Sequence, residues 1–318
     1  MDYSQILSQQ FNIKEEYAKN IITLLDDGNT IPFIARYRKE MHGSMDDQLI
    51  REFAEKLEYL RGLDKRRDEI RSLIDAQEKL TDEINLALDK AATLSELEDI
   101  YRPYRPKRKT RASIAKEKGL EPLANDILKQ EKGFDPSKSA ADYIDEEKGV
   151  TSVEDAIQGA MDIIAELVSD NAEIRKRIRN LTNANGVLVS VATDEEKDSV
   201  YKNYYDYKEP VKKIAGHRVL AVNRGEKEGF LKVSVETDSE KPLNSIFRAM
   251  ITDKNQLCSD IIREACTDAY QRLIYPSIER EVRNDLTDTA AENAMKVFAV
   301  NLKQLLMQPP VKGKTVLA

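Results

Sequence analysis

Apolar residues recur through most of the chain at intervals of three and four positions, which is the spacing of one face of an α-helix. Tyr17, Ile21 and Leu24 show this spacing first, and they predict a helix over residues 14–27 that Gly28 would end. The pattern therefore predicts a protein built mainly of helices. Further helices are predicted over residues 30–40, 44–77, 81–91, 94–101, 113–118, 120–130, 140–145, 151–168, 171–181, 243–251, 257–275 and 277–307.

Polar residues and prolines predict where some of these helices begin. Asn12 with Glu15, and Thr151 with Glu154, have the spacing of a capping box, in which two side chains satisfy the free N–H groups of a first turn. Pro276 stands directly before the last predicted helix, where a proline suits helix entry. We therefore expect the last helix to be separate from the one before it.

Two short segments depart from the helical period. Residues 186–192 and 230–236 are rich in valine, and the second alternates apolar with polar residues, as a strand with one buried face does. Residues 217–224 fit either a strand or a helix. The expected fold class is mainly α: a multihelical region of several subdomains with a small β element at about residues 186–236.

Composition adds limits to this picture. Of the 318 residues, 41% are apolar and 34% are charged, and no apolar run approaches the roughly 20 residues that cross a bilayer. The first residues lack the pattern of a signal peptide, so we expect a cytoplasmic protein with no membrane partner. Cys258 and Cys266 are expected to be small core residues rather than redox groups.

One basic segment contrasts with an acidic chain. The net charge is −7, yet residues 100–112, I-Y-R-P-Y-R-P-K-R-K-T-R-A, contain six cations and no acid. Pro103 and Pro106 fix the backbone and remove donors, so residues 102–111, the basic loop, are expected to form a stiff connection between helices. Its cations are Arg102, Arg105, Lys107, Arg108, Lys109 and Arg111.

The basic loop has two interpretations. Each cation could neutralise a phosphate, with Tyr101 and Tyr104 against sugar or base, because phosphate contacts supply much of the affinity for nucleic acids. Alternatively, the loop is a solvated connector whose arginines pair with nearby carboxylates such as Glu96, Glu98 and Asp99. Charge alone does not separate the two interpretations.

A second aromatic and basic run presents the same choice. Tyr201, Tyr204, Tyr205 and Tyr207 lie among lysines, as on surfaces that bind single strands. Tyrosine is amphipathic, and it commonly packs its ring while its hydroxyl stays in water. We favour the interpretation in which these rings pack a loop beneath the small sheet.

Groups for catalysis do not form a known pattern. His42 and His217 are far apart and lack metal-ligand spacing, and the chain has no C-x-x-C, G-x-S-x-G or G-x-x-x-x-G-K-[ST] motif. We therefore expect no enzymatic activity, no metal, no cofactor and no small-molecule substrate.

Five longer motifs, in this order, carry a resemblance. They are T-I-P-F-I-A-R-Y-R-K-E (30–40), L-E-D-I-Y-R-P-Y-R-P-K-R-K-T-R-A (97–112), G-L-E-P-L-A (119–124), A-G-H-R-V-L-A-V-N-R-G-E-K-E-G-F-L (215–231) and K-G-K-T-V-L-A (312–318). Together they resemble the N-terminal region of the Tex family of bacterial transcription accessory proteins, over essentially the whole chain.

The resemblance implies a cytoplasmic, nucleic-acid-binding protein whose N-terminal region is multihelical and includes a helix-turn-helix-like subdomain. It favours a helix for residues 217–224. It also implies that residues 312–318 begin the first strand of an RNase H-like domain. The chain is therefore expected to be a fragment that lacks the family's OB-fold RNA-binding domain.

The expected organisation has four parts. Residues 1–62 form the N-terminal helical part, and residues 63–130 form the helix-turn-helix-like subdomain with the basic loop. Residues 131–308 form a helical region with the small β element, and residues 309–318 form a linker and the first-strand stub of the missing domain.

The functional hypothesis is a scaffold that binds nucleic acid, either RNA or DNA. Its six loop cations would contact backbone phosphates, so binding would have little sequence specificity. The alternative is a protein-interaction scaffold that docks RNA polymerase, other transcription machinery or the protein's own C-terminal domains.

Overall fold

The computed structural model describes residues 2–106, 108–252, 254–308 and 313, and it divides the chain into two compact units, Met1–Arg105 and Pro106–Ala318. Both units are mainly helical, and the second also contains a small three-stranded sheet. The expected fold class, mainly α with a small β element, is therefore confirmed.

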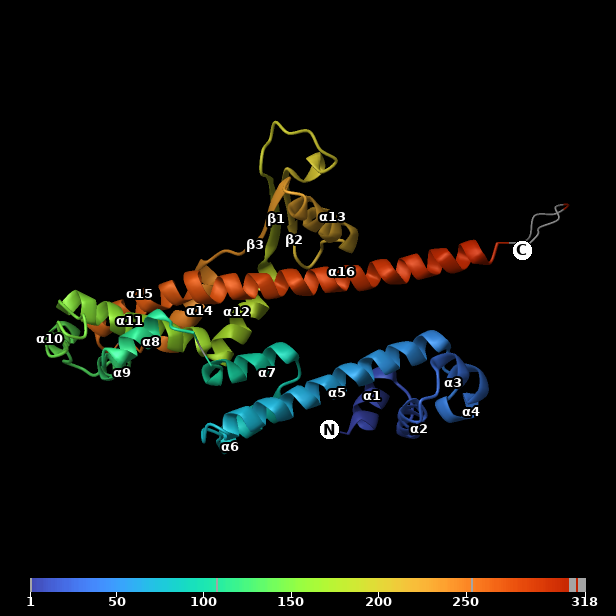
Figure 1. Ribbon diagram of the computed structural model, residues 1–318, viewed down its shortest axis with the longest axis horizontal. Coiled ribbons are helices and arrows are strands. Elements are labelled where there is room, and N and C mark those ends of the chain that lie inside the picture. The colour runs from blue at the N-terminus through green and yellow to red at the C-terminus, as the bar shows by residue number, and fades with distance from the viewer. Residues whose placement is uncertain (1, 107, 253, 309–312, 314–318) are drawn as a thin grey trace. The chain divides into compact units, whose positions relative to one another are not determined.

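The first unit is built on one long helix, α5 (Asp47–Asp75). Three short helices pack against its N-terminal half, and a fourth packs against α2 (Figure 1). Leu7, Ile34 and Phe53 are fully buried in this core. The short helices are α1 (Tyr3–Phe11), α2 (Glu15–Asp26), α3 (Ile31–Tyr37) and α4 (Lys39–His42).

A second small core covers the C-terminal half of α5. It is formed by α6 (Asp82–Lys90) and α7 (Leu94–Tyr101), and a 3-10 turn, η1 (Arg102–Tyr104), follows directly. Arg67 of α5 is only 4% exposed, and its guanidinium donates to the carbonyl oxygens of Leu88 at 2.8 Å and Ala91 at 3.0 Å. These bonds attach the end of α6 to α5.

The second unit has a helical body centred on α11 (Val153–Asp170). Ala156, Ala160 and Ile164 are buried along α11, and the small alanines let neighbouring helices approach closely. The longest helix, α16 (Tyr275–Leu306), starts in this body and extends past the sheet (Figure 1). The other helices of the body are α8 (Arg111–Glu117), α9 (Glu121–Lys129), α10 (Pro136–Ala141), α12 (Ala172–Asn185), α14 (Glu240–Met250) and α15 (Gln256–Asp268).

The sheet is antiparallel with strand order β2-β1-β3. Its strands are β1 (Val187–Ala192), β2 (Asp206–Pro210) and β3 (Leu231–Glu236), and α13 (Gly216–Lys227) packs on one face. Ser190 of the central strand lies opposite Tyr207 and Val233. Leu188, Val222 and Val233 form a separate small core between the sheet and α13.

Most predicted elements are present, many of them within one or two residues of their expected ends. The helix expected at 140–145 lies earlier, at Pro136–Ala141, and the predicted segment 30–40 divides into α3 and α4. The strands at 186–192 and 230–236 are confirmed as β1 and β3. The segment that fitted either a strand or a helix is helical, as the family resemblance implied, and forms α13. Two elements were not predicted, α1 and β2.

Both predicted capping boxes are wrong in detail. Asn12 has left-handed backbone at the end of α1, and the residue before α2 is Lys14, which makes no side-chain cap bond. At α11 the cap is Ser152, whose side chain accepts from the N–H of Asp155. Thr151 instead donates from its N–H and its hydroxyl to the carboxylate of Asp155. The cap therefore lies one residue later than predicted.

The predicted separation before the last helix is also wrong. The chain passes from α15 through a π-helical turn (Ala269–Ile274) directly into α16. Pro276 lies in the first turn after the π-helical segment, where its missing N–H is tolerated because the hydrogen-bond spacing has already changed.

The expected four-part organisation stays a prediction. Its first boundary, between residues 62 and 63, falls inside α5, and the division of the chain into two compact units falls within the basic loop. The helices proposed for the helix-turn-helix-like subdomain belong to both units, with α6 and α7 in the first and α8 and α9 in the second. The linker and strand stub at 309–318 lie outside the described residues, apart from Gly313.

Candidate nucleic-acid interface

The first part of the basic loop is held by α7 and α5. Arg105 pairs with Glu98, and its guanidinium carbon lies 5.7 Å from the centre of the Tyr101 ring. Arg66 donates from Nε to Glu98 Oε1 at 2.7 Å, and its guanidinium also lies 5.7 Å from the same ring centre. One carboxylate is therefore shared by two arginines, and Arg66 also pairs with Glu69 at 3.1 Å, so Glu98 is the only one of these two carboxylates that Arg105 contacts.

The 3-10 turn after α7 is fixed by backbone contacts. The side-chain amide of Gln77 donates to the carbonyl oxygen of Tyr104 at 2.9 Å. Arg102 is half-buried and is engaged in interactions of its own. Arg105, which follows this turn, remains 55% exposed. Of the two arginines that the basic loop contributes to this unit, Arg105 is therefore the more available to a phosphate.

The last part of the basic loop is fixed by the start of α8. Thr110 and Ser113 form a capping box, with the Ser113 N–H donating to Thr110 Oγ1 at 3.0 Å and the Thr110 N–H donating to Ser113 Oγ at 2.8 Å. The Thr110 hydroxyl also donates to Glu166 Oε1 of α11 at 3.1 Å. The two residues directly before this anchor, Arg108 and Lys109, are exposed.

These two exposed cations are weakly engaged. Lys109 Nζ lies 3.6 Å from Glu117 Oε2, and both side chains are about two-thirds exposed. Arg108 makes no hydrogen bond or ion pair with the residues that the structure describes. An exposed pair contributes about 0–1 kcal/mol, so a phosphate can replace Glu117 at small cost.

Arg111 faces an acidic group instead. Burial raises the pKa of the Asp162 carboxyl, while the positive charges of Arg272 and Arg111 lower it. Arg272 Nη2 lies 3.7 Å from Asp162 Oδ1. Part of the charge of Arg111 therefore acts within the protein, as the connector interpretation supposed.

The six predicted contact residues are divided between the two units. Arg102 and Arg105 belong to the first unit, whereas Arg108, Lys109 and Arg111 belong to the second. Lys107 lies outside the described residues. Both interpretations of the loop have support, because some of its cations have carboxylate partners and others are exposed.

The tyrosine run packs as favoured by the sequence, with one difference. Tyr204 and Tyr207 meet edge to face with ring centres 5.2 Å apart. The Tyr201 hydroxyl donates to Glu228 at 2.9 Å, and the Tyr205 hydroxyl donates to Ser199 Oγ at 2.9 Å. These hydroxyls bond protein groups rather than only water, so the rings are committed to the structure.

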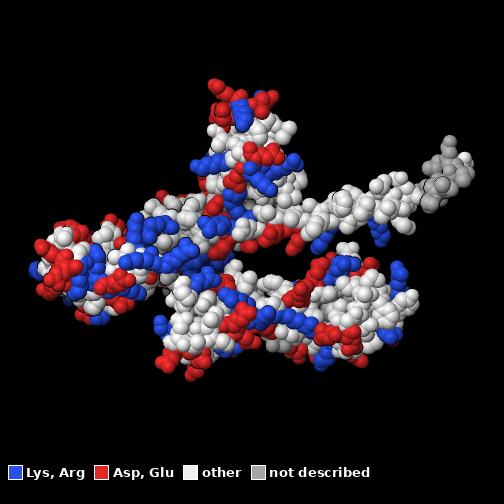
Figure 2. Space-filling view, in the orientation of Figure 1, with Lys and Arg blue, Asp and Glu red and all other residues white. Residues whose placement is uncertain are grey.

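Two further arginines of the first unit, both on α5, are neutralised in place. Arg61 makes two bonds to Asp26 at 2.7 and 2.8 Å. Arg71 bonds Asp68 and Asp89, each at 2.7 Å. Figure 2 shows the two signs of charge interleaved along α5. We therefore do not assign a phosphate surface to this helix.

The end of α16 is a surface that the sequence analysis missed. Met295, Phe298, Leu302 and Leu305 repeat at intervals of three and four, and each is between 42% and 67% exposed. Figure 2 shows this part of α16 as mostly uncharged. The spacing was visible in the sequence, but a regular apolar stripe predicts burial rather than exposure.

Other chemistry is limited among the described residues. No group of three or more His, Cys, Asp or Glu side chains there could hold a metal ion. Burial raises the pKa of Cys266 to about 12, so this thiol stays protonated. None of the helices that the structure describes is long and apolar enough to cross a membrane.

Known proteins match the chain in two blocks. The model for the Tex-like protein N-terminal domain matches residues 1–75, and the Tex central region-like model matches residues 131–298. YdcI of Bacillus subtilis is 44% identical over the whole chain, which covers 45% of that protein. Transcriptional accessory protein Tex of Neisseria gonorrhoeae is 36% identical over the whole chain, which covers 42% of it.

A human relative also aligns along nearly the full chain. S1 RNA-binding domain-containing protein 1 is 31% identical over 99% of this chain, which covers 33% of that protein. The chain spans less than half the length of each of these relatives. Since the central-region model alone covers more than half of the chain and the N-terminal model precedes it, the chain belongs to the Tex family.

Proposed function

We propose that this part of a Tex-like transcription accessory protein binds nucleic acid through backbone phosphates, with Arg105, Arg108 and Lys109 as the leading contacts. The observation that carries the proposal is the exposure of these three cations on a proline-stiffened segment. Arg105 stays 55% exposed although it pairs with Glu98. The ion pair of Lys109 is exposed, and Arg108 has no ion pair with the described residues. Arg102, Lys107 and Arg111 complete the proposed set. Contacts to phosphate carry no base information, so binding should be weakly sequence-specific.

The names of relatives support this class of partner. One relative is named a transcriptional accessory protein, and another is named for an S1 RNA-binding domain. The matched region is a minor part of both proteins. The preference for RNA or DNA is therefore part of the test.

The test compares the chain with a variant in which all six loop cations are alanine, using labelled single-stranded RNA and duplex DNA. We expect the variant to bind about tenfold or more weakly to whichever partner the chain prefers, because several phosphate contacts are lost. Equal affinity of the two proteins would remove the basic loop from the proposal. Circular dichroism of the variant checks that its helices are intact.

A second function, a protein-interaction scaffold, is favoured by the end of α16. An exposed apolar stripe of this kind commonly marks a protein contact. In this alternative, α16 docks RNA polymerase, other transcription machinery or further domains of a full-length Tex-like protein. Purified polymerase should then be retained by the chain after nuclease treatment.

Matched variants separate these functions. Phe298→Asp with Leu302→Asp places charge in the stripe, whereas Val300→Asp places it outside the stripe on the same exposed helix. The scaffold proposal expects loss of polymerase binding only for the first variant. Nucleic-acid binding should be unchanged in both.

We further propose a cytoplasmic protein with no enzymatic activity. The absence of a known catalytic motif in the sequence supports the second point. Metal-dependent cleavage of RNA or DNA by the purified chain, lost on adding a chelator, would contradict it.

A further inference from the structure

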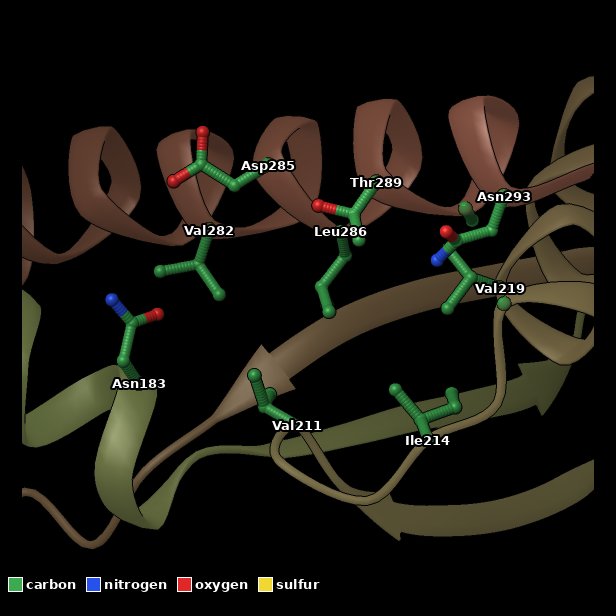
Figure 3. A pocket seen from close by; sticks show the side chains of 11 residues that line it. Asn183, Val211, Ile214, Val219, Val282, Asp285, Leu286, Thr289 and Asn293 are labelled. Carbon is green, nitrogen blue, oxygen red and sulfur yellow. The ribbon is translucent and has the colours of Figure 1, made fainter. Parts of the chain in front are cut away.

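A pocket lies between α16, the end of α12 and the segment that joins β2 to α13. Val282 and Leu286 of α16 point toward Val211 and Ile214 across the pocket, as Figure 3 shows. Two aliphatic layers therefore face each other, with open space between them. The pocket lies where the core of the helical body meets the core of the sheet.

Polar groups line the rim of this pocket. Asn183 lies at one end and Asn293 at the other, while Asp285 and Thr289 lie on α16 between them (Figure 3). None of these four side chains makes a hydrogen bond or ion pair with the described part of the chain. The pocket therefore offers two amides, a hydroxyl and a carboxylate that are free to bind a ligand.

Two polar residues of α16 outside the pocket are engaged in the fold. Glu281 accepts from Arg175 at 2.8 Å and from Arg179 at 2.9 Å. The Thr287 hydroxyl accepts from Asn223 at 2.8 Å. The fold therefore uses Glu281 and Thr287, whereas its described residues make no such bond with the four polar side chains at the rim of the pocket.

The size of the pocket restricts its ligand. Its volume is about 190 Å³, below the roughly 300–1,000 Å³ of pockets for cofactors and drug-sized ligands. A cavity of about 150 Å³ accepts one benzene ring. The pocket therefore suits one small planar ring system between its aliphatic layers.

Charge near the pocket is divided between two sides. Lys212 and Lys213 are exposed on the segment that supplies Val211 and Ile214. On the α16 side, burial raises the pKa of Asp285 first, and the nearby carboxylates of Glu281 and Asp288 raise it further. A ligand with a polar ring and an attached anion would match this distribution of charge. Its ring would lie beside Asp285 on α16, and its anion would lie near Lys212 and Lys213.

We propose that the pocket binds one unstacked nucleobase of a single-stranded nucleic acid, with the adjoining phosphate near Lys212 and Lys213. The aliphatic layers cover the faces of the base, and the amides and Asp285 bond its edge, which is how proteins recognise bases that are splayed out of a strand. A carboxylate accepts hydrogen bonds, so at this position of the ring it favours the N4 amino group of cytosine over the O4 carbonyl of uracil. The proposal rests on nucleic-acid binding by this chain but uses a site separate from the basic loop.

The test measures affinity for labelled oligocytidine and oligouridine RNA of equal length, and for free CMP and UMP. We expect the chain to prefer cytidine by about tenfold, the effect of one good base contact. Asn183→Ala with Asn293→Ala, and separately Asp285→Asn, should remove this preference. Asn203→Ala with Asn301→Ala is the control, because both asparagines are exposed outside the pocket.

The outcomes distinguish the two proposed sites. Loss of cytidine preference in the pocket variants, with binding to oligouridine retained, supports the pocket. RNA binding that ignores base identity in the wild type overturns the pocket and leaves the basic loop in place. If CMP binds equally well to the wild type and to the loop variant with six alanines, the result supports the pocket alone. If no oligonucleotide or mononucleotide binds, both sites are overturned.

Discussion

Gly186 shows how closely one backbone position is restricted where α12 meets β1. A Cβ atom at this position would lie 2.4 Å from the carbonyl oxygen of Thr182 and 3.1 Å from Val235 Cγ1. The same carbonyl oxygen of Thr182 accepts a hydrogen bond from the Gly186 N–H at 2.7 Å. This bond keeps the oxygen from moving away from an added Cβ atom. Only glycine fits this approach of helix and strand.

Gly186→Ala should therefore lower the free energy of unfolding by about 1–3 kcal/mol, the usual cost of overpacking. Gly62→Ala is the matched control, because nothing lies within 4 Å of a Cβ there and the residue is exposed in the middle of α5. The control should gain about 0.5–1 kcal/mol. Urea unfolding followed by circular dichroism measures both, and equal stability of the two variants would contradict the account.

Asp162 gives a dependence of stability on pH. Burial raises the pKa of its carboxyl, so above pH 4 the folded state holds this proton more tightly than the unfolded state. The free energy of unfolding should therefore fall as the pH rises above about 4 and Asp162 loses its proton. At pH 7, Asp162→Asn should be more stable than wild type. The difference should shrink toward pH 4 in thermal unfolding.

Asp145 provides a control, because its pKa is shifted in the opposite direction to that of Asp162. A hydrogen bond from Lys148 lowers the pKa of the Asp145 carboxyl most strongly. The ionised form is therefore favoured in the folded state, and its contribution is lost as the pH falls. Asp145→Asn should be less stable than wild type at pH 7. If both variants, Asp162→Asn and Asp145→Asn, were more stable or both were less stable than wild type at pH 7, the opposite pKa shifts of the two carboxyls would be refuted.

The cations of the candidate site could be predicted from the sequence, but only some of their partners could. Glu98 is near Arg105 in the chain and was expected as a neighbour. Asp162 lies some fifty residues from Arg111, and its approach depends on how α8 packs on α11. Local sequence carries no information on that packing.

At the scale of elements, β3 has an edge that is closed by side chains. The N–H of Val233 donates to Glu226 at 3.3 Å, and its carbonyl accepts from Arg283 at 3.0 Å. The N–H of Val235 donates to a glutamate of α16, and its carbonyl accepts from a tyrosine hydroxyl. This edge is therefore protected from pairing with another chain.

Arg283→Ala should destabilise the sheet. It leaves the Val233 carbonyl and the Glu226 carboxylate without their guanidinium partner, at a cost of about 1–3 kcal/mol. Arg280→Ala is the control, because Arg280 is exposed one turn away on the same helix. Near-ultraviolet circular dichroism of the tyrosines, followed in urea, reports on the sheet, and matching midpoints for the two variants would contradict this role.

The elements that were missed have physical causes. β2 has the sequence D-Y-K-E-P, which is polar and ends in proline, because it is an edge strand with one side in solvent. The helix α1 is short, and its buried residues include two serines that weaken its apolar pattern. The long amphipathic helices, by contrast, were predicted because their buried faces repeat over several turns.

At the scale of the whole molecule, each compact unit has its own hydrophobic core and the basic loop connects them. The family and the mainly α fold could be predicted from long motifs and periodicity. The division within the basic loop could not, because it depends on which helices share a core. The exposed end of α16 could not be predicted either, for the same reason.

Limited trypsin digestion should cut first in the basic loop. Trypsin does not cut before proline, so Arg102 and Arg105 are protected and cleavage should fall at residues 107–111. Two fragments should then persist, because each unit has a core of its own. Bound nucleic acid should slow the cut. First cleavage at the exposed Lys197, or no effect of nucleic acid, would count against the account.

The most direct test of phosphate binding is the salt dependence of affinity, measured by fluorescence anisotropy with a labelled single strand. The variant Arg105→Ala, Arg108→Ala, Lys109→Ala is compared with wild type and with a control that loses the same charge elsewhere, Lys132→Ala, Lys138→Ala, Lys241→Ala. Each lost phosphate contact lowers the slope of log Kd against log salt by about 0.7. The account predicts a slope lower by about 2 for the loop variant alone. An unchanged slope for that variant, or an equal drop for the control, would contradict it.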